Sequence, residues 1–238
     1  MQTYREVAQI IEMNKRVVAF TGAGISVDAG IPAFRGGQGL WEKYDPMEYA
    51  EISAFHRSPE KVWTMLREMG DVILRAEPTP AHKGLGIMEA AGLLDAVITQ
   101  NVDGLHDLAG SGRILKLHGD IWRMRCTTCG SNWPDRRVPL PKLPPHCGCG
   151  GLARPGVVWF GEPLPAGMMQ EAEHATLAAQ VLLVVGTSAQ VYPAAGLIPL
   201  AKQAGARVIQ VNLEPTPYSG IVDCALEGPA GELLPQLI

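Results

Sequence analysis

Residues 17–35, VVAFTGAGISVDAGIPAFR, hold the stretch around which the chain is organised. Residues 17–20 form an apolar run rich in valine, which is typical of a buried strand. Gly22 and Gly24 follow, and glycines at such a point permit a tight turn and close approach of the backbone to a ligand. A helix opening at Ile25 would offer free N–H groups and a positive dipole end to a phosphate. The stretch therefore predicts a nucleotide-binding strand, turn and helix.

The same stretch departs from the fingerprint of ordinary dinucleotide-binding dehydrogenases. That fingerprint places a third glycine or alanine three residues after the second glycine, where this chain has Val27. No clear second strand ending in an acidic residue follows at the expected distance. A hydride-transferring oxidoreductase is therefore disfavoured.

Composition limits the other classes of protein. The 238 residues are 47% hydrophobic and 18% charged, which predicts a globular chain with one good core and room for small insertions. The net charge of −4 and pI near 5.9 argue against general nucleic-acid binding. No apolar run approaches membrane-spanning length, and the first residues lack an apolar signal core. We therefore expect a cytoplasmic protein with no membrane partner.

Polar residues gather where further apolar runs end. Residues 96–99 precede Gln100, Asn101 and Asp103; residues 114–117 precede His118; residues 181–185 precede Gly186, Thr187 and Ser188; residues 208–211 precede Asn212 and Glu214. Ligand groups in open parallel sheets collect at the carboxyl ends of strands, and histidine suits proton transfer near neutral pH. Helix capping would explain Asp103, Thr187 or Ser188 but not Gln100. A lone histidine is usually structural, yet its place at a strand end favours a role in catalysis.

Four of the five cysteines form a cluster typical of metal binding in a cytosolic protein. Cys126 and Cys129 make a C-x-x-C pair, whereas Cys147 and Cys149 are separated by one residue. Two such pairs predict one structural, tetrahedral Zn²⁺. Either all four thiolates bind, which we favour, or His146 replaces Cys147 and restores the two-residue spacing.

The alternation of strands and helices predicts an α/β fold, a doubly wound parallel Rossmann-like sheet with two insertions. Residues 1–35, 81–122 and 154–238 are expected to form the Rossmann-like, nucleotide-binding domain. Residues 36–80, which begin in a glycine-rich loop, are expected to form a helical lid module. Residues 123–153 are expected to form a small zinc-ribbon module.

Several separate strings resemble the sirtuins, NAD-dependent protein-lysine deacylases, of the prokaryotic type. They include GAGIS-x-x-x-GIP-x-FRG, TQN-x-D-x-LH, LHG, RP-x-V-V-x-FGE and GTS, and with the flanking segments the resemblance spans residues 17 to about 231 in family order. The short second cysteine pair departs from the family's usual C-x-x-C. The resemblance implies deacetylation of protein lysine with NAD as co-substrate, releasing nicotinamide, O-acetyl-ADP-ribose and free lysine.

The resemblance also implies roles for individual residues. His118 would be the general base, and Asn101 and Asp103 would hold the nicotinamide end and its water. The cofactor would contact Gly22, Ala23, Gly24, Ile25, Phe34, Arg35, Gln100, Asn101, Asp103, Gly186, Thr187, Ser188, Asn212, Glu214 and Ala230. The substrate would contact Val158, Phe160, Gly161, Glu162, Val191 and Tyr192, with the acyl-lysine peptide bound as an added β-strand.

The resemblance bears on the acyl group as well. Sirtuins that remove succinyl or malonyl groups carry a Tyr-x-x-Arg pair, and this chain has Leu66 and Met69 at those places. Because neither side chain can pair with a carboxylate, we expect acetyl and longer apolar acyl groups to be preferred. Two other functions remain as alternatives: protein ADP-ribosylation at the same NAD site, and a non-catalytic zinc-ribbon binding module. The second would have no need for His118 and the polar strand ends.

Overall fold

The computed structural model describes residues 4–34, 39–165 and 167–237. Its strands are β1 (Val17–Thr21), β2 (Leu94–Thr99), β3 (Ile114–Lys116), β4 (Gly119–Cys126), β5 (Asn132–Pro134), β6 (Ala153–Val157), β7 (Val181–Val185), β8 (Arg207–Asn212) and β9 (Cys224–Glu227). Its helices are α1 (Tyr4–Met13), α2 (Leu40–Lys43), α3 (Pro46–Tyr49), α4 (Ile52–Arg57), α5 (Pro59–Arg75), α6 (Pro80–Ala90), α7 (Leu105–Leu108), α8 (Met168–Ala178), α9 (Leu197–Gln203) and α10 (Ala230–Leu233). Short 3₁₀ helices are η1 (Ala23–Ala29), η2 (Ala194–Gly196) and η3 (Leu234–Leu237).

The larger sheet is parallel, with the strand order β3-β2-β1-β7-β8-β9. The order reverses between β1 and β7, where Val17 to Thr21 pair in register with Val181 to Val185. A reversal of this kind leaves a crevice at the carboxyl ends of the two strands. This sheet confirms the predicted doubly wound, Rossmann-like fold, and it places residues 22 and 186 at the crevice.

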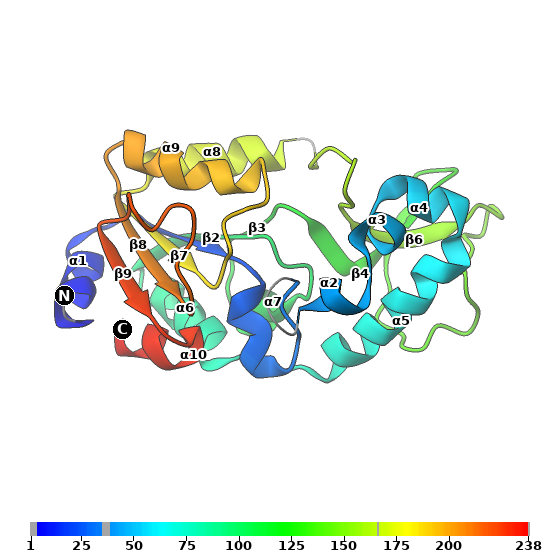
Figure 1. Ribbon diagram of the computed structural model, residues 1–238, viewed down its shortest axis with the longest axis horizontal. Helices are drawn as coiled ribbons and strands as arrows, with labels where there is room; N and C mark the ends of the chain where they lie inside the picture. The colour runs from blue at the N-terminus through cyan, green and yellow to red at the C-terminus, as the bar shows by residue number, and fades with distance from the viewer. Residues whose placement is uncertain (1–3, 35–38, 166, 238) are drawn as a thin grey trace.

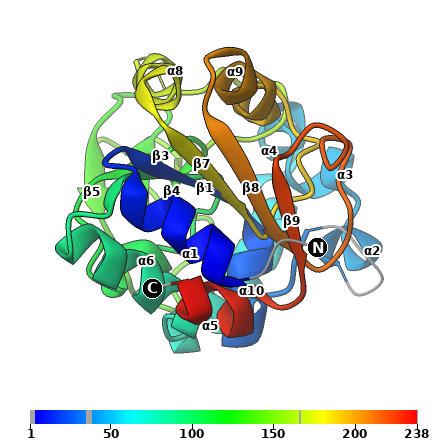
Figure 2. The ribbon, with the colours of Figure 1, turned by 90° about the vertical axis from the view of Figure 1, so that its left-hand side faces the viewer.

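Helices cover both faces of the sheet (Figures 1 and 2). On one face α1, α6 and α10 enclose a core that includes Val7, Ile11, Leu85 and Leu233. On the other face α8 and α9 pack over the opposite side chains of the same strands. Strands β1 and β7 are buried along their whole length because both faces are covered, which explains their unbroken apolar runs.

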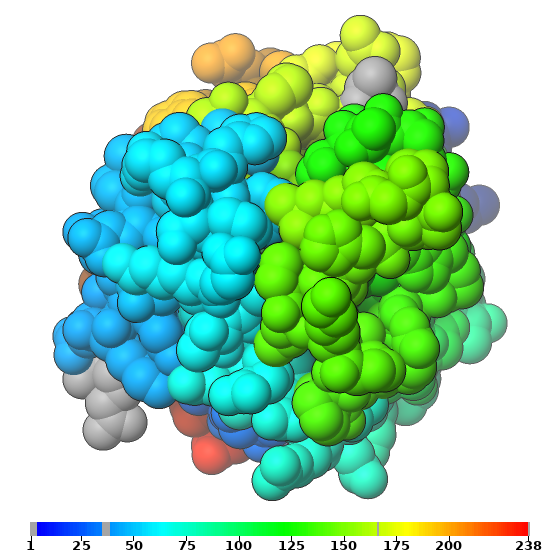
Figure 3. Space-filling model, turned by 90° about the vertical axis from the view of Figure 1, so that its right-hand side faces the viewer, coloured from blue at the N-terminus to red at the C-terminus, as the bar shows by residue number. Residues whose placement is uncertain are grey.

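The two insertions pack together into one smaller body beside the main sheet (Figure 1). Strands β5, β4 and β6 form an antiparallel sheet that carries the cysteines. Phe55 and Trp63 of the helical insertion share a buried cluster with Met124 and Ala153 of this sheet. Figure 3 shows the two insertions in contact on this face of the molecule. The domain boundaries given above remain a prediction. Strand β6 pairs with the smaller sheet, although residues from 154 onward were assigned to the Rossmann-like domain.

One element begins earlier than the sequence predicts. The segment after the glycine turn is a 3₁₀ helix that begins at Ala23, where a helix opening at Ile25 was expected, and Gly30 ends it with a φ of 82°. Strand β6 ends at Val157, and in residues 158–160 only Phe160 forms a β-bridge, an isolated one with Glu51. The reason is local: the Trp159 N–H bonds the Glu162 carboxylate at 3.0 Å instead of a neighbouring strand. Among the described helices, none has the length and apolar character needed to cross a membrane.

Candidate functional site

A cavity of about 1220 Å³ lies between the carboxyl ends of the larger sheet and the inserted modules. It is lined by most of the predicted site residues, namely Gly22, Ala23, Gly24, Phe34, Gln100, Asn101, His118, Val158, Phe160, Gly161, Glu162, Gly186, Thr187, Ser188, Val191, Tyr192, Asn212 and Glu214. Ile25, Asp103 and Ala230 are buried and do not line it. Arg35 lies outside the described residues. Residues far apart in sequence thus meet around one space large enough for a dinucleotide and part of a peptide.

The glycines after β1 and β7 pack backbone against backbone. The Gly24 N–H donates to the Gly186 carbonyl at 2.8 Å. A Cβ added at Gly24 would lie 2.8 Å from the Gly186 Cα, closer than real Cβ contacts come. Gly186 itself has a φ of 58°, a conformation that glycine adopts without strain. Glycine is therefore required at both positions for β1 and β7 to form the floor of the cavity.

Gln100 and Asn101 are fixed directly after β2. The Gln100 side-chain amide donates to the Thr187 hydroxyl at 2.9 Å, which joins the ends of β2 and β7 across β1. The Asn101 amide donates to the Gly22 carbonyl and to the Ser26 hydroxyl, both at 3.2 Å. Asn101 is 5% exposed, so its amide is held in one orientation beside the glycine turn. These contacts explain why a glutamine and an asparagine follow this strand.

Asp103 acts on the cavity through other residues. Its carboxylate accepts hydrogen bonds from the Ser26 hydroxyl at 2.8 Å and from the Leu105 N–H at 2.9 Å. Burial raises the pKa of Asp103, and these two hydrogen bonds only partly oppose the shift. Because Ser26 in turn accepts from Asn101, Asp103 orients Asn101 from behind. Gly104 is the N-cap residue of α7, so Asp103 is not its N-cap; instead its carboxylate accepts from the N–H of Leu105, the first residue of the helix, as in an Asx turn.

Two buried histidines lie beneath this network, with ring centroids 4.7 Å apart. His82 Nδ1 accepts from the Thr79 N–H in a capping box, so Nε2 carries the proton and faces the Ser26 hydroxyl at 3.5 Å. Burial lowers the pKa of His82 to about 3 and that of His106 to about 4, so both are neutral at pH 7. Ser26 and His106 were not predicted as site residues, although both belong to the strings quoted for the resemblance.

His118 follows β3 and lines the cavity. Its Nδ1 lies 3.0 Å from the Gln100 carbonyl oxygen, which can only accept. Nδ1 therefore carries the proton in the neutral ring, and Nε2 keeps its lone pair. Burial lowers the pKa of His118, and the hydrogen bond to Gln100 offsets only part of this shift. The ring is thus neutral at pH 7 with one nitrogen ready to accept a proton.

The segment after β6 is held by a buried ion pair. Arg154 donates two hydrogen bonds to the Glu162 carboxylate, at 2.6 and 2.8 Å, and a third to the Val157 carbonyl at 2.6 Å. Its guanidinium also stacks on the Trp159 ring, 3.8 Å from the centroid. These contacts fold residues 157–162 into a fixed turn along the cavity. The Glu162 carboxylate, predicted to contact substrate, therefore has its partners within the chain.

The helical insertion supplies the apolar wall of the cavity through Met65, Leu66 and Met69. Phe34 contacts Trp41 at a centroid distance of 5.1 Å, and Trp41 lies 6.3 Å from Phe160. These aromatic rings connect the nucleotide stretch, the inserted helices and the segment after β6. No ionisable side chain is contributed to the cavity by α5.

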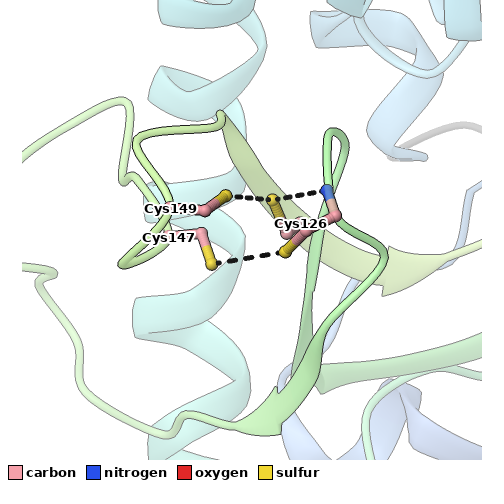
Figure 4. Close-up of side chains that lie close together, drawn as sticks. Cys126, Cys147 and Cys149 are labelled. Atoms are coloured by element: carbon pink, nitrogen blue, oxygen red, sulfur yellow. Dashed lines mark hydrogen bonds between the residues drawn. The ribbon is translucent and has the colours of Figure 1, made fainter.

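Cys126, Cys129, Cys147 and Cys149 bring their sulfur atoms within 4.8 Å of one another. Figure 4 shows the loop with Cys147 and Cys149 facing Cys126. The Cys126–Cys149 and Cys129–Cys147 sulfur distances are 3.6 and 3.8 Å. A tetrahedral Zn²⁺ with Zn–S bonds of about 2.3 Å separates its sulfurs by about 3.8 Å, so the four thiolates fit the metal. His146 instead places Nδ1 3.1 Å from the Pro144 carbonyl, which favours Cys147 as the ligand.

The model of the Sir2 family matches residues 22–193, from the glycine turn to the segment after β7. The chain belongs to the Sir2 family. This confirms the resemblance to the sirtuins that the separate strings predicted. Members of the family share this fold and use NAD, which makes this chain an NAD-dependent enzyme.

Comparison with individual proteins agrees with the family. The chain is 49% identical over 233 residues to NAD-dependent protein deacylase 2 of Pyrobaculum aerophilum, covering 98% of this chain and 93% of that protein. A Sir2 homolog–NAD complex superposes with a TM-score of 0.93 at 42% identity, covering 100% of this chain and 93% of the other. A Sir2 variant with a deacetylated p53 peptide and 3′-O-acetyl ADP-ribose gives 0.93 at 33% identity, with 99% and 97% covered.

Proposed function

We propose that this protein is an NAD-dependent protein-lysine deacylase in which His118 is the general base. The observation that carries the proposal is the position of His118, a neutral ring with a free Nε2 on the cavity that the glycine turn and the segment after β6 also line. NAD supplies the ribose carbon that receives the acyl oxygen, with nicotinamide as its leaving group. The chain must then bind the dinucleotide, hold the acyl-lysine beside it and accept a proton.

The residues at the strand ends divide these tasks. Backbone groups at Gly22, Gly24 and Gly186 form the floor on which the dinucleotide lies. Asn101 is oriented by Ser26 and Asp103. Its hydrogen bond to the Gly22 carbonyl places it beside the glycine turn, which supports a role in binding the nicotinamide end of NAD. His118 accepts the proton of a ribose hydroxyl at Nε2, and the Gln100 carbonyl stabilises the imidazolium that results.

The peptide is proposed to bind as a strand between residues 158–161 and residues 190–192. Both segments line the cavity. The Phe160 N–H and carbonyl already pair with Ala50 and Ile52 of the helical insertion. Within the described chain, the Val158 carbonyl and the Gly161 N–H have no hydrogen-bond partner. Unpaired backbone groups beside a cavity are what an added strand requires.

The apolar wall supports a preference among acyl groups. Met65, Leu66 and Met69 offer no partner for a carboxylate, and an unpaired charge is costly to bury. Acetyl-lysine and longer apolar acyl-lysines are the proposed substrates, and succinyl-lysine is expected to be a poor one. Comparable turnover of succinyl-lysine and acetyl-lysine peptides would refute this preference.

His118→Ala tests the proposed function. Loss of a general base lowers kcat by about 100- to 10,000-fold, while NAD binding and the folded state are retained. His174→Ala, at an exposed position on α8, is the matched control and is expected to act as wild type. Full deacylation by His118→Ala would remove His118 from the mechanism. Mass gain on a protein acceptor without loss of its acyl group would instead support ADP-ribosyl transfer.

A cytoplasmic location is part of the same proposal. It is supported by the five cysteines, which are all free thiols in the structure, because disulfides are rare in cytosolic proteins. The acidic balance also supports protein or peptide partners over nucleic acid.

A further inference from the structure

Tyr192 forms part of the cavity wall, and its hydroxyl is hydrogen-bonded to a residue that does not line the cavity. Tyr192 follows β7, lines the cavity and is 68% exposed. Its hydroxyl hydrogen-bonds the hydroxyl of Tyr218, which lies in the loop between β8 and β9. A large side chain this exposed is mobile unless another group holds it, and here the holding group is Tyr218.

Tyr218 is in turn part of a fixed turn. Its N–H donates to the Thr216 hydroxyl at 3.2 Å, and the Thr216 N–H donates to the Ser219 hydroxyl at 2.7 Å. The Tyr218 ring is half-buried and packs against the core that α8 and α9 cover. The turn thus presents the Tyr218 hydroxyl in one place.

The turn is anchored to the interior of the sheet by Gln210. Gln210 lies on β8, is 2% exposed and stands between the apolar residues Ile209 and Val211. Its Oε1 accepts from the hydroxyls of Thr216 and Ser219, each at 3.0 Å. A buried amide on a central strand costs stability unless it is paired, and these two hydroxyls provide the pairing. The chain of contacts therefore runs from Gln210 through the turn and Tyr218 to Tyr192.

We infer that Tyr218 is a positioning residue for the peptide substrate, which it serves by fixing the Tyr192 ring as a wall of the peptide groove. The inference rests on the proposed function, because it assigns the groove beside residues 190–192 to a peptide. Gln210 contributes to the same positioning by anchoring the turn that carries Tyr218. Tyr218 itself does not line the cavity, so its effect passes through Tyr192.

Tyr218→Phe removes the holding hydroxyl and keeps the packed ring. The expected result is a rise of about two- to tenfold in KM for an acetyl-lysine peptide, the range for one lost neutral hydrogen bond. Both kcat and the KM for NAD stay at the wild-type values, which a general loss of structure would not allow. Tyr4→Phe, on α1 and away from the cavity, is the control and leaves all three constants unchanged.

A double-mutant cycle separates this role from a direct contact of either hydroxyl with substrate. Tyr192→Phe and the double variant are expected to raise the peptide KM by the same factor as Tyr218→Phe, because each breaks one shared bond. Gln210→Leu is expected to act in the same direction. An unchanged peptide KM in Tyr218→Phe, or additive effects in the cycle, would overturn the inference. If the wild-type protein deacylates the peptide in these experiments, the proposed function stands whatever the variants show. If it does not, both the proposed function and the role of Tyr218 are refuted.

Discussion

Glu162→Ala is expected to destabilise the fold by about 3 kcal/mol, because it leaves a buried guanidinium without its counterion. The Arg154 side chain is 7% exposed and that of Glu162 is 20% exposed. Removing one partner of a buried ion pair costs about 3–5 kcal/mol. The lower end applies here, since Arg154 keeps its bond to the Val157 carbonyl and its stacking on Trp159. For a chain of this size, a loss of that magnitude lowers Tm by about 6–12 °C.

The assay is thermal and urea unfolding of wild type and variant at pH 7, with Glu171→Ala as the control. Glu171 is exposed on α8 and forms no ion pair within the described residues, so its loss is expected to change stability by less than about 0.5 kcal/mol. A Glu162→Ala variant as stable as Glu171→Ala would show that the Arg154–Glu162 ion pair does not stabilise the fold.

The pH dependence of the Glu162→Ala effect is a second check. Burial tends to raise the pKa of Glu162, but the bonds from Arg154 and the Trp159 N–H outweigh it and hold the pKa below its usual value. A carboxyl whose pKa is depressed on folding contributes stability above its unfolded pKa and loses it as pH falls through the folded value. The difference between wild type and variant is therefore expected to shrink in acid, below about pH 4.3. A difference that stayed constant down to pH 2 would contradict the ion-pair explanation.

Three further predictions follow from the site. Gly24→Ala places a Cβ 2.8 Å from the Gly186 backbone, and isothermal titration is expected to show NAD affinity reduced at least tenfold with the zinc content unchanged. Cys147→Ser is expected to lose Zn²⁺ and to destabilise the smaller sheet, whereas His146→Ala is expected to retain both the metal and the stability. The opposite result in metal analysis would show that His146, and not Cys147, is the zinc ligand. Because burial lowers the pKa of His118, the acid limb of kcat/KM is expected below pH 6.5, and a midpoint above 7 would contradict a neutral, buried base.

The parallel sheet was predictable from the sequence because its signals are local. Residues 17–20 and 181–185 are continuous apolar runs, and each ends in glycine and polar residues. Short apolar runs of this kind are typical of strands covered on both faces, and the carboxyl ends of parallel strands meet at one edge of the sheet. The positions of Gln100, Asn101 and His118 at ligand-binding strand ends were predicted in this way, and the resemblance to the sirtuins added their roles.

Contacts that depend on tertiary structure were not predictable in this way. Glu162 was predicted to contact substrate because the segment RP-x-V-V-x-FGE resembles that of the sirtuins. Its hydrogen bonds to Arg154 could not be predicted, because they depend on the turn after β6. Asp103 and Asn101 are two residues apart, yet Ser26 connects them from another part of the chain. The packing of the helical insertion on the cysteine-bearing sheet likewise depends on pairs such as Trp63 and the Ala153 carbonyl, 90 residues apart.

The most direct test of NAD-dependent deacylation is to mix the purified protein with NAD and an acetyl-lysine peptide and to follow both products by mass spectrometry. We expect deacetylated peptide and O-acetyl-ADP-ribose in equal amounts, with no product when NAD is omitted. Deacetylation without NAD consumption, or NAD consumption with the peptide's acetyl group intact, would contradict it.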